Sequence, residues 1–233
     1  WHLRNVGETA GAIAFRMGST KFDSLSCMTI DAILERAREK RFEWQDEAAE
    51  FLLTLRKRSE LPTLVLNTAG TGSGKTRANA KLACSLSATP RFCIALNLRS
   101  LTLQTGDSLR RDLKLGRDEM SVVIGDRVVG KLHNASSDTF YRGADDAEDS
   151  EVEVDLAGEF FELPNWLSRL GDRDGKFGCL VLPPVLVSTV DFIVKAGEPG
   201  ERGGHALALL RVMHSDLILD EIDSYDPQSL IAV

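Results

Sequence analysis

The 233-residue sequence lacks the features of a membrane-spanning, disulfide-bonded or zinc-binding protein. None of its apolar runs reaches the roughly 18 residues of a transmembrane helix, so we expect no membrane partner. Its four cysteines include no pair with C-x-x-C spacing, which argues against zinc ligands and disulfides. We expect buried, reduced thiols, as in a cytoplasmic protein, at Cys27, Cys84, Cys93 and Cys179. The chain also lacks an initial methionine and a signal peptide, and we therefore expect it to be part of a longer protein.

Positive charge is scarce as well. The 28 basic residues are outnumbered by 35 acidic ones, and the net charge of −7 argues against a surface that coats nucleic acid broadly. Nine of the acids lie in residues 143–162, which contain no lysine or arginine; without them the net charge would be +2, so a local positive groove remains compatible with the composition. We expect this segment to be a solvated surface insertion, and the alternative is a strip that mimics nucleic acid or docks a partner.

The sequence does contain enough apolar residues, 43%, for one globular domain with a sizeable core. Short apolar runs alternate with segments of helical periodicity, which predicts a mostly parallel sheet with helices on both faces. The expected strands are residues 63–67, 91–96, 121–125, 185–188 and 216–220. The expected helices are residues 30–40 (capped by Asp31), 41–58, 74–87, 100–114, 190–196 and 205–214. We assign residues 1–40 to a helical extension from a preceding domain, and residues 41–233 to the domain itself.

Residues 69–76, A-G-T-G-S-G-K-T, match the phosphate-binding loop pattern with Ala69 in the first glycine position. They lie between an expected strand and an expected helix, which is the context that such a loop needs. The glycines let backbone N–H groups point at phosphate oxygens, Lys75 would bind the β- and γ-phosphates, and the Thr76 hydroxyl would bind Mg²⁺. We predict that a nucleoside triphosphate is bound by Gly70, Thr71, Gly72, Ser73, Gly74, Lys75 and Thr76. The alternative is a glycine-rich turn with a solvated lysine.

A second part of the expected site follows the last strand, where residues 216–223 read D-L-I-L-D-E-I-D. Asp220, at the strand end, would hold Mg²⁺, and Glu221 would orient and deprotonate the attacking water. An acid pair after an apolar run is common, but the phosphate-binding loop earlier in the chain makes this one informative. The predicted catalytic residues are therefore Lys75, Asp220 and Glu221.

These two sequences resemble motifs I and II of superfamily 2 helicases and translocases. In such motors a glutamine upstream of the loop binds adenine, because its amide both donates and accepts hydrogen bonds. Gln45 has that place here, with Phe42 and Trp44 as candidate stacking partners for the base. The alternative is that Gln45 is an ordinary exposed helix residue.

Two strand-to-helix turns, in residues 96–113 and 186–193, resemble the motifs with which the same motors contact the DNA backbone. Hydroxyl, amide and guanidinium groups suit phosphate contacts that do not read bases. The candidates are Arg99, Thr102, Gln104, Thr105, Ser188 and Thr189. We expect both turns at the sheet edge that carries the phosphate-binding loop; the alternative is that these side chains only cap helices.

Five segments in order resemble a narrower family, the CRISPR-associated helicase–nucleases of type I-F systems. They are F-x-W-Q-D-x-A, T-G-S-G-K-T-x-A-N-A-K, L-R-S-L-T-L-Q-T-G-D, P-V-L-V-S-T-V-D and S-D-L-I-L-D-E-I-D-S-Y-D-P. The resemblance implies the first RecA-like P-loop NTPase domain of a protein that also contains an adaptation subunit, an HD nuclease, a second RecA-like domain and a C-terminal domain. No histidine here is followed by aspartate, so this sequence contains no HD pair.

By resemblance, the whole protein is an enzyme that hydrolyses ATP with Mg²⁺, translocates on single-stranded DNA in the 3′-to-5′ direction and feeds a nuclease during CRISPR interference. Its implied partners are the guide-RNA surveillance complex, the spacer-integration protein and phage anti-CRISPR proteins. The fragment alone should be inactive, because the arginine fingers belong to the second motor domain. The alternatives are another superfamily 2 helicase acting on DNA or RNA, and a non-motor P-loop ATPase or docking fragment.

Overall fold

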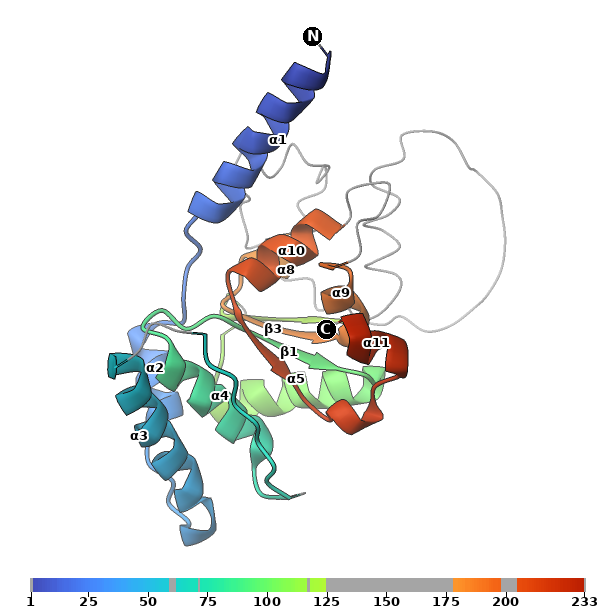
Figure 1. Cartoon of the computed structure of the whole chain (residues 1–233). Helices are drawn as coiled ribbons and strands as arrows, with labels where there is room; N and C mark the ends of the chain where they lie inside the picture. The colour runs from blue at the N-terminus through green and yellow to red at the C-terminus, as the bar shows by residue number, and fades with distance from the viewer. Residues whose placement is uncertain are drawn as a thin grey trace.

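A computed structural model of the chain describes residues 2–58, 62–70, 72–116, 118–124, 178–197 and 205–232. In these residues four strands form one sheet in the order β2-β3-β1-β4, and every pairing is parallel (Figure 1). The strands are β1 (Phe92–Leu96), β2 (Met120–Val123), β3 (Val185–Thr189) and β4 (Asp216–Leu219). The predicted α/β fold with a parallel, RecA-like sheet is therefore confirmed.

Helices cover both faces of the sheet, with α8, α9 and α10 above it and α2, α4 and α5 below it in Figure 1. The helical elements are α1 (His2–Ser19), α2 (Cys27–Leu34), the 3₁₀ turn η1 (Lys40–Phe42), α3 (Glu43–Arg58), α4 (Lys75–Leu86), α5 (Arg99–Leu113), α8 (Gly178–Val181), α9 (Val190–Val194), α10 (His205–Met213), the 3₁₀ turn η3 (Ile222–Ser224) and α11 (Pro227–Ala232). Five of the six expected helices, those at residues 41–58, 74–87, 100–114, 190–196 and 205–214, match α3, α4, α5, α9 and α10 to within two residues.

The core is divided by the sheet into two apolar clusters, because successive side chains of a strand point to opposite faces. In β1, Cys93 and Ala95 pack with α8, α9 and α10, whereas Phe92, Ile94 and Leu96 pack with α2, α4 and α5. All five residues are buried, as is usual for a strand of a parallel sheet with two covered faces.

Helix α5 lies unusually close to the sheet at Gly106. A β-carbon at this position would lie 2.5 Å from Val122 Cγ2 of β2. Glycine therefore sets how closely α5 approaches the sheet, and with it where the turn after β1 lies.

The second helix begins and ends earlier than the sequence suggests. It spans Cys27–Leu34, and its N-cap is Ser26, whose hydroxyl oxygen accepts a hydrogen bond from the Thr29 N–H at 3.2 Å. The predicted cap at Asp31 is therefore wrong, because a serine earlier in the chain satisfies the free N–H groups of the first turn.

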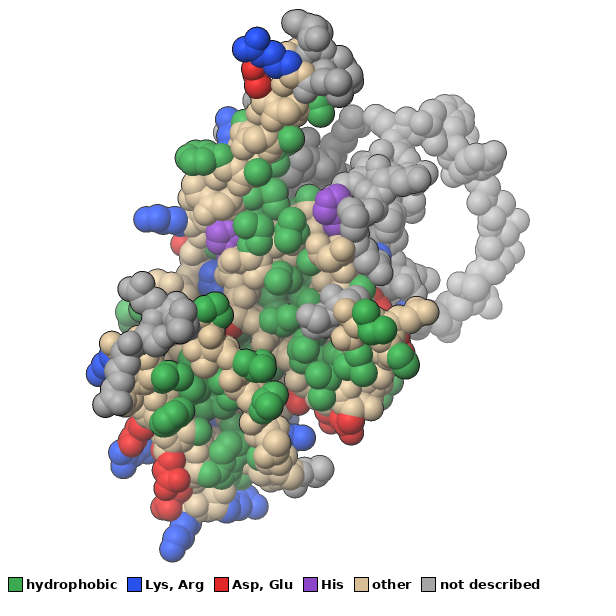
Figure 2. Space-filling model, in the orientation of Figure 1, with side chains coloured by type: hydrophobic (Ala, Val, Ile, Leu, Met, Phe, Trp, Pro, Cys, Tyr) green, Lys and Arg blue, Asp and Glu red, His purple; other side chains and the backbone are tan. Residues whose placement is uncertain are grey.

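The predicted strand at residues 63–67 is also absent from the sheet. The segment has no regular secondary structure, and Leu64 and Leu66 are 84% and 79% exposed. A strand needs a neighbour that pairs with its backbone, and the only described partner of the edge strand β4 is β1. Figure 2 shows hydrophobic side chains gathered on the face where β4 and residues 62–70 lie; exposed members include Leu64, Leu66 and Leu217.

Helix α1 projects away from the sheet (Figure 1). Phe15 is exposed on it, whereas Met17 at its end is buried in the cluster above the sheet. The segment that follows belongs to the packed body, since Leu25 and Ile33 are buried in the cluster below the sheet. The division of the chain at residue 40 stays a prediction.

Three of the four cysteines are buried, free thiols, as expected, but Cys27 is exposed on α2. Burial raises the pKa of the Cys84 thiol to about 12, with a further contribution from the charge of Asp216. In the described part of the chain, no helix is both long and apolar enough to span a bilayer. The acidic segment, residues 143–162, lies outside the described residues.

Candidate functional site

The phosphate-binding loop leads directly into α4, as the sequence predicts. Gly72 and Gly74 both have φ of +77°, a left-handed conformation that only glycine adopts readily, and Lys75 is the first residue of the helix. The loop turns back on itself, because the N–H and the hydroxyl of Ser73 donate to the Gly70 carbonyl at 3.3 and 2.6 Å. Lys75 and Thr76 are half-buried at the helix start, and Thr71 lies outside the described residues.

Asn67 fastens the chain before the loop to the middle of α4. Its Nδ2 donates to Asn79 Oδ1 at 2.9 Å, and its Oδ1 accepts from the Ala69 N–H at 3.1 Å. Residues 67–70 are therefore folded against the helix without the help of a strand.

Gln45 lies against the phosphate-binding loop. Its side chain is buried, and its Nε2 donates to the carbonyl oxygens of Ser73 and Gly74, both at 3.3 Å. The interpretation of Gln45 as an exposed helix residue is therefore wrong. A β-carbon on Gly74 would lie 2.8 Å from Gln45 Nε2 and 3.2 Å from Phe42 Cε1, so residue 74 needs glycine for space as well as for its backbone. Trp44 is half-buried beside them in the chain.

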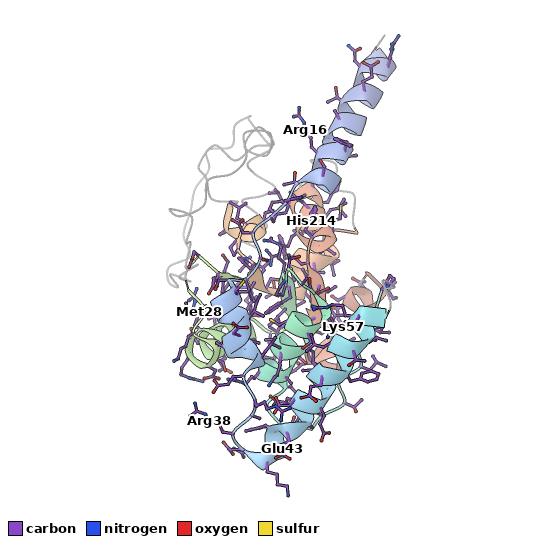
Figure 3. All side chains as sticks on the ribbon, turned by 90° about the vertical axis from the view of Figure 1, so that its left-hand side faces the viewer. Arg16, Met28, Arg38, Glu43, Lys57 and His214 are labelled. Atoms are coloured by element: carbon purple, nitrogen blue, oxygen red, sulfur yellow. The ribbon has the colours of Figure 1, made fainter. Side chains whose placement is uncertain are left out.

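A buried ion pair that was not predicted from the sequence lies beside Gln45. Lys81 Nζ of α4 contacts Asp46 Oδ1 of α3, and it also donates to the Glu35 carbonyl oxygen at 2.8 Å. The other Asp46 oxygen, Oδ2, accepts from the Ala37 N–H at 3.0 Å. Figure 3 shows α3 running from Glu43 to Lys57. The available signal in the sequence was a lysine next to the small and apolar residues of the expected helix, A-K-L-A-C.

The carboxyl ends of β1, β3 and β4 meet at one edge of the sheet. Leu96 is in register with Thr189, and Ala95 with Leu219. The next residue, Asp220, is half-buried; its N–H donates to the Ala95 carbonyl at 3.1 Å, and its Oδ1 accepts from the Glu221 N–H at 3.1 Å. Glu221 is exposed and has φ of +52°, so the acidic turn follows the strand abruptly.

Two residues that the sequence analysis did not single out hold this turn. Tyr225 donates its hydroxyl to the Ala95 carbonyl at 2.6 Å, and Asn97 Nδ2 donates to the Ser224 carbonyl. Burial raises the pKa of the Tyr225 phenol, and the charge of Asp220 raises it further. The segment S-Y-D-P after the acids was the only hint of this contact.

The six predicted DNA-contacting residues divide by exposure. Arg99 and Gln104 are exposed, whereas the four hydroxyl residues are buried: Thr102, Thr105, Ser188 and Thr189. The Thr102 hydroxyl donates to the Leu98 carbonyl at 2.9 Å, which is a contact within its own helix. Of the predicted residues, Arg99 and Gln104 are therefore the two that present side chains to solvent; Arg99 begins α5 just after β1, and Gln104 lies five residues further along the helix.

The structure places Gln45 and Phe42 against the phosphate-binding loop. It also places the turns that follow β1 and β3 at the same sheet edge as Asp220, which follows β4. Within the described residues, no hydrogen bond or ion pair links Lys75 or Thr76 to Asp220 or Glu221, and no three His, Cys, Asp or Glu side chains form a metal cluster. The Thr76 hydroxyl and the Asp220 carboxylate are nevertheless oxygen donors of the kind that Mg²⁺ prefers, and this ion often completes its shell with phosphate oxygens and water.

Comparison with known proteins confirms the resemblance to the type I-F helicase–nucleases. The chain is 39% identical over 212 residues to the CRISPR-associated nuclease/helicase Cas3 subtype I-F/YPEST of Pseudomonas aeruginosa (strain UCBPP-PA14), covering 85% of the chain and 19% of the relative. It is 37% identical over 250 residues to the protein of the same description from Pectobacterium atrosepticum (strain SCRI 1043), covering 100% of the chain and 22% of the relative. The chain thus spans about a fifth of the length of these relatives. No protein-family model matches it.

Proposed function

We propose that this chain, which matches one segment of the type I-F Cas3 nuclease/helicases, is the ATP-binding half of an ATP-dependent translocase on single-stranded DNA. The observation that carries the proposal is the contact of Gln45 with the carbonyls of Ser73 and Gly74. It joins a residue suited to binding a base to a loop suited to binding phosphates, and a nucleotide requires both.

The Gln45 contact favours adenine over guanine. Because Nε2 is bonded to the loop, and Oε1 accepts no hydrogen bond from the described residues, Oε1 is the atom left to accept one from the base. Adenine offers an amino group at its Watson–Crick edge, where guanine offers a carbonyl oxygen, and two acceptors cannot pair. Phe42 and Trp44 would pack against the base.

The remaining roles follow from charge and chemistry. Lys75 would bind the β- and γ-phosphates together with the backbone N–H groups of residues 70–76. Thr76 and Asp220 would hold Mg²⁺, which neutralises charge on the phosphates. Glu221, exposed directly after Asp220, would orient and deprotonate the attacking water. The described residues offer no second domain to supply an arginine finger, which is worth about 10³–10⁵ in the rate of related reactions.

The edge formed by the ends of β1 and β3 would provide half of the DNA track. Exposed Arg99 and Gln104 would contact phosphates there, and the buried hydroxyls of Thr102, Thr105, Ser188 and Thr189 would need the turns to open before they could do so. By resemblance, the whole protein would move 3′ to 5′ and deliver foreign DNA to its HD nuclease. Recruitment by the guide-RNA surveillance complex, and contacts with the spacer-integration protein and phage anti-CRISPR proteins, belong to the same proposal.

The test measures ATP binding and turnover in the full-length protein, with and without single-stranded DNA, for the wild type, Lys75→Ala and Glu221→Gln. Lys75→Ala should lose both binding and turnover, because the positive charge of Lys75 is no longer present to bind the β- and γ-phosphates. Glu221→Gln should bind ATP but not hydrolyse it, since Lys75, Thr76 and Asp220 remain.

Turnover that single-stranded DNA does not stimulate in the wild type would instead point to a non-motor ATPase. The 233-residue chain alone should bind Mg-ATP weakly and hydrolyse it negligibly. Robust DNA-stimulated turnover by this fragment would contradict the assignment of half a site.

A further inference from the structure

We propose that Asp46 and Lys81 are positioning residues for base selectivity: their buried ion pair fixes how α3 lies on α4 and so holds the Gln45 amide against the phosphate-binding loop. The inference rests on the proposed function, because it assigns a role in nucleotide selection to residues that would not touch the nucleotide.

The pair and the Gln45 contact form two points of attachment between the same two helices. Gly74, the N-cap of α4, and Lys81 within the helix are seven residues apart, a distance of about 10 Å along the helix axis, and both contact α3. On α3, the two partners Gln45 and Asp46 are adjacent in sequence. Apolar packing, with Ala49 and Leu52 of α3 buried, keeps the two helices together, and the ion pair adds a specific polar contact that fixes their register next to Gln45.

The Asp46–Lys81 ion pair is largely buried, and each of its two members also bonds to a backbone group. The Lys81 side chain is 2% exposed and that of Asp46 is 14% exposed. Lys81 Nζ also bonds the Glu35 carbonyl, and Asp46 Oδ2 accepts from the Ala37 N–H, so the link between α2 and α3 is held at the same point. Removal of either partner would leave an uncompensated charge in a buried place, which is strongly unfavourable.

The Gln45 contact is sensitive to such a change. Its two hydrogen bonds are 3.3 Å long, beyond the usual 2.7–3.2 Å of N–H···O bonds. A small shift of α3 would therefore end them, and Nε2 and Oε1 would then be able to exchange places. An amide that can flip accepts from adenine in one orientation and donates to guanine in the other, so selectivity would be lost before affinity.

A second ion pair in the same region supplies a matched control. Arg36 and Glu50 join the α2–α3 link to α3 at 2.6 Å, but their side chains are 81% and 61% exposed. An exposed pair of this kind contributes little to rigidity or stability. Its removal should therefore leave base selectivity unchanged.

The experiment uses the full-length protein and measures Kd for Mg-ATP and Mg-GTP, together with the melting temperature. The variants are Asp46→Asn, Lys81→Met, the double variant Asp46→Asn/Lys81→Met, Gln45→Ala and the control Glu50→Gln. We expect the ratio of GTP Kd to ATP Kd to fall about five- to tenfold in the Asp46 and Lys81 variants, toward that of Gln45→Ala. Glu50→Gln should keep the wild-type ratio.

The ratio separates positioning from mere stability, because general destabilisation weakens ATP and GTP binding alike. If a single variant does not fold, the double variant, which buries no unpaired charge, carries the test. A wild-type ratio in folded Asp46→Asn or double variants, with a lower ratio in Gln45→Ala, would overturn this inference and leave the proposed function intact. Absence of ATP preference in the wild type would overturn both this inference and the role of Gln45.

Discussion

The Tyr225 hydroxyl donates to the Ala95 carbonyl oxygen at 2.6 Å, and the same oxygen accepts the Asp220 N–H at 3.1 Å. One atom of β1 therefore holds the chain on both sides of Glu221. Asn97, just beyond β1, adds a bond to the Ser224 carbonyl. These contacts fix the acidic turn to the sheet at a place where Glu221 has an uncommon left-handed backbone.

Tyr225→Phe tests this attachment. The substitution keeps the buried ring and removes one hydrogen bond, which should lower the free energy of unfolding by about 0.5–1.5 kcal/mol. Because the turn then has more freedom, DNA-stimulated ATP turnover in the full-length protein should fall while ATP binding persists. Thermal melting and single-turnover kinetics measure the two effects. Unchanged melting and turnover would show that the hydroxyl does not hold the turn.

Arg211→Met should destabilise the protein strongly. Arg211 is fully buried, and its guanidinium donates to Cys93 Sγ at 2.9 Å and to backbone carbonyls of Phe92 and Pro184, both at 3.0 Å, and of Val181 and Pro183. Methionine would remove all of these charge-assisted hydrogen bonds, at a cost of about 3 kcal/mol or more, although the Val181 and Pro184 carbonyls would keep their bonds from Arg91 Nη2 and the Phe92 N–H. Chemical denaturation measures the loss.

Arg211→Lys is the matched variant, because it keeps the positive charge. A lysine cannot span these acceptors with its single ammonium group, so we expect most of the loss to remain. Full recovery with lysine would show that the charge, and not the shape of the guanidinium, is what this position needs.

Glu119 should make stability depend on pH in the acid range. Burial alone would raise the pKa of its carboxyl, but hydrogen bonds from the Thr29 hydroxyl and from the N–H groups of Gly116 and Ser26 outweigh that effect and lower the pKa below its ordinary 4.5. A lowered folded-state pKa stabilises the protein above the unfolded-state value, and this contribution is lost as the pH falls through the folded-state pKa.

Urea denaturation of wild type and Glu119→Gln at several pH values measures this contribution. The wild type should be more stable near pH 7, and the difference should shrink as the pH falls below about 4.5. Glu8→Gln, on exposed α1, serves as the control and should not change the profile. A difference that stays constant with pH would contradict the assignment.

Hydrogen exchange should distinguish residues 64–66 from the strands. These residues lie outside the sheet with Leu64 and Leu66 exposed, so their amides should exchange rapidly in the 233-residue chain, whereas those of Cys93, Ile94 and Ala95 should exchange slowly. In the full-length protein, protection at 64–66 would show that a further segment pairs with this run. Slow exchange in the isolated chain would contradict the described structure.

Much of the architecture could be predicted from the sequence, because it depends on local patterns. The buried run of β1, the amphipathic α3 and the glycine loop that opens α4 are each set by residues that are close along the chain. The alternation of strands and helices along the chain is set by the same local patterns, and it predicts a parallel sheet. Gln45 could be selected as a base-binding candidate from its residue type and its place before the loop.

Only the tertiary structure decided which polar groups meet. Asp46 and Lys81 are 35 residues apart, and Ala95 and Tyr225 are 130 residues apart, so no local pattern pairs them. It also decided that Thr102 and Ser188 are buried, because helix and sheet packing, not residue type, determines which hydroxyls reach solvent. For residues 63–67 the local preference for a strand went unfulfilled, since backbone pairing requires a neighbour and the open edge of β4 has none among the described residues.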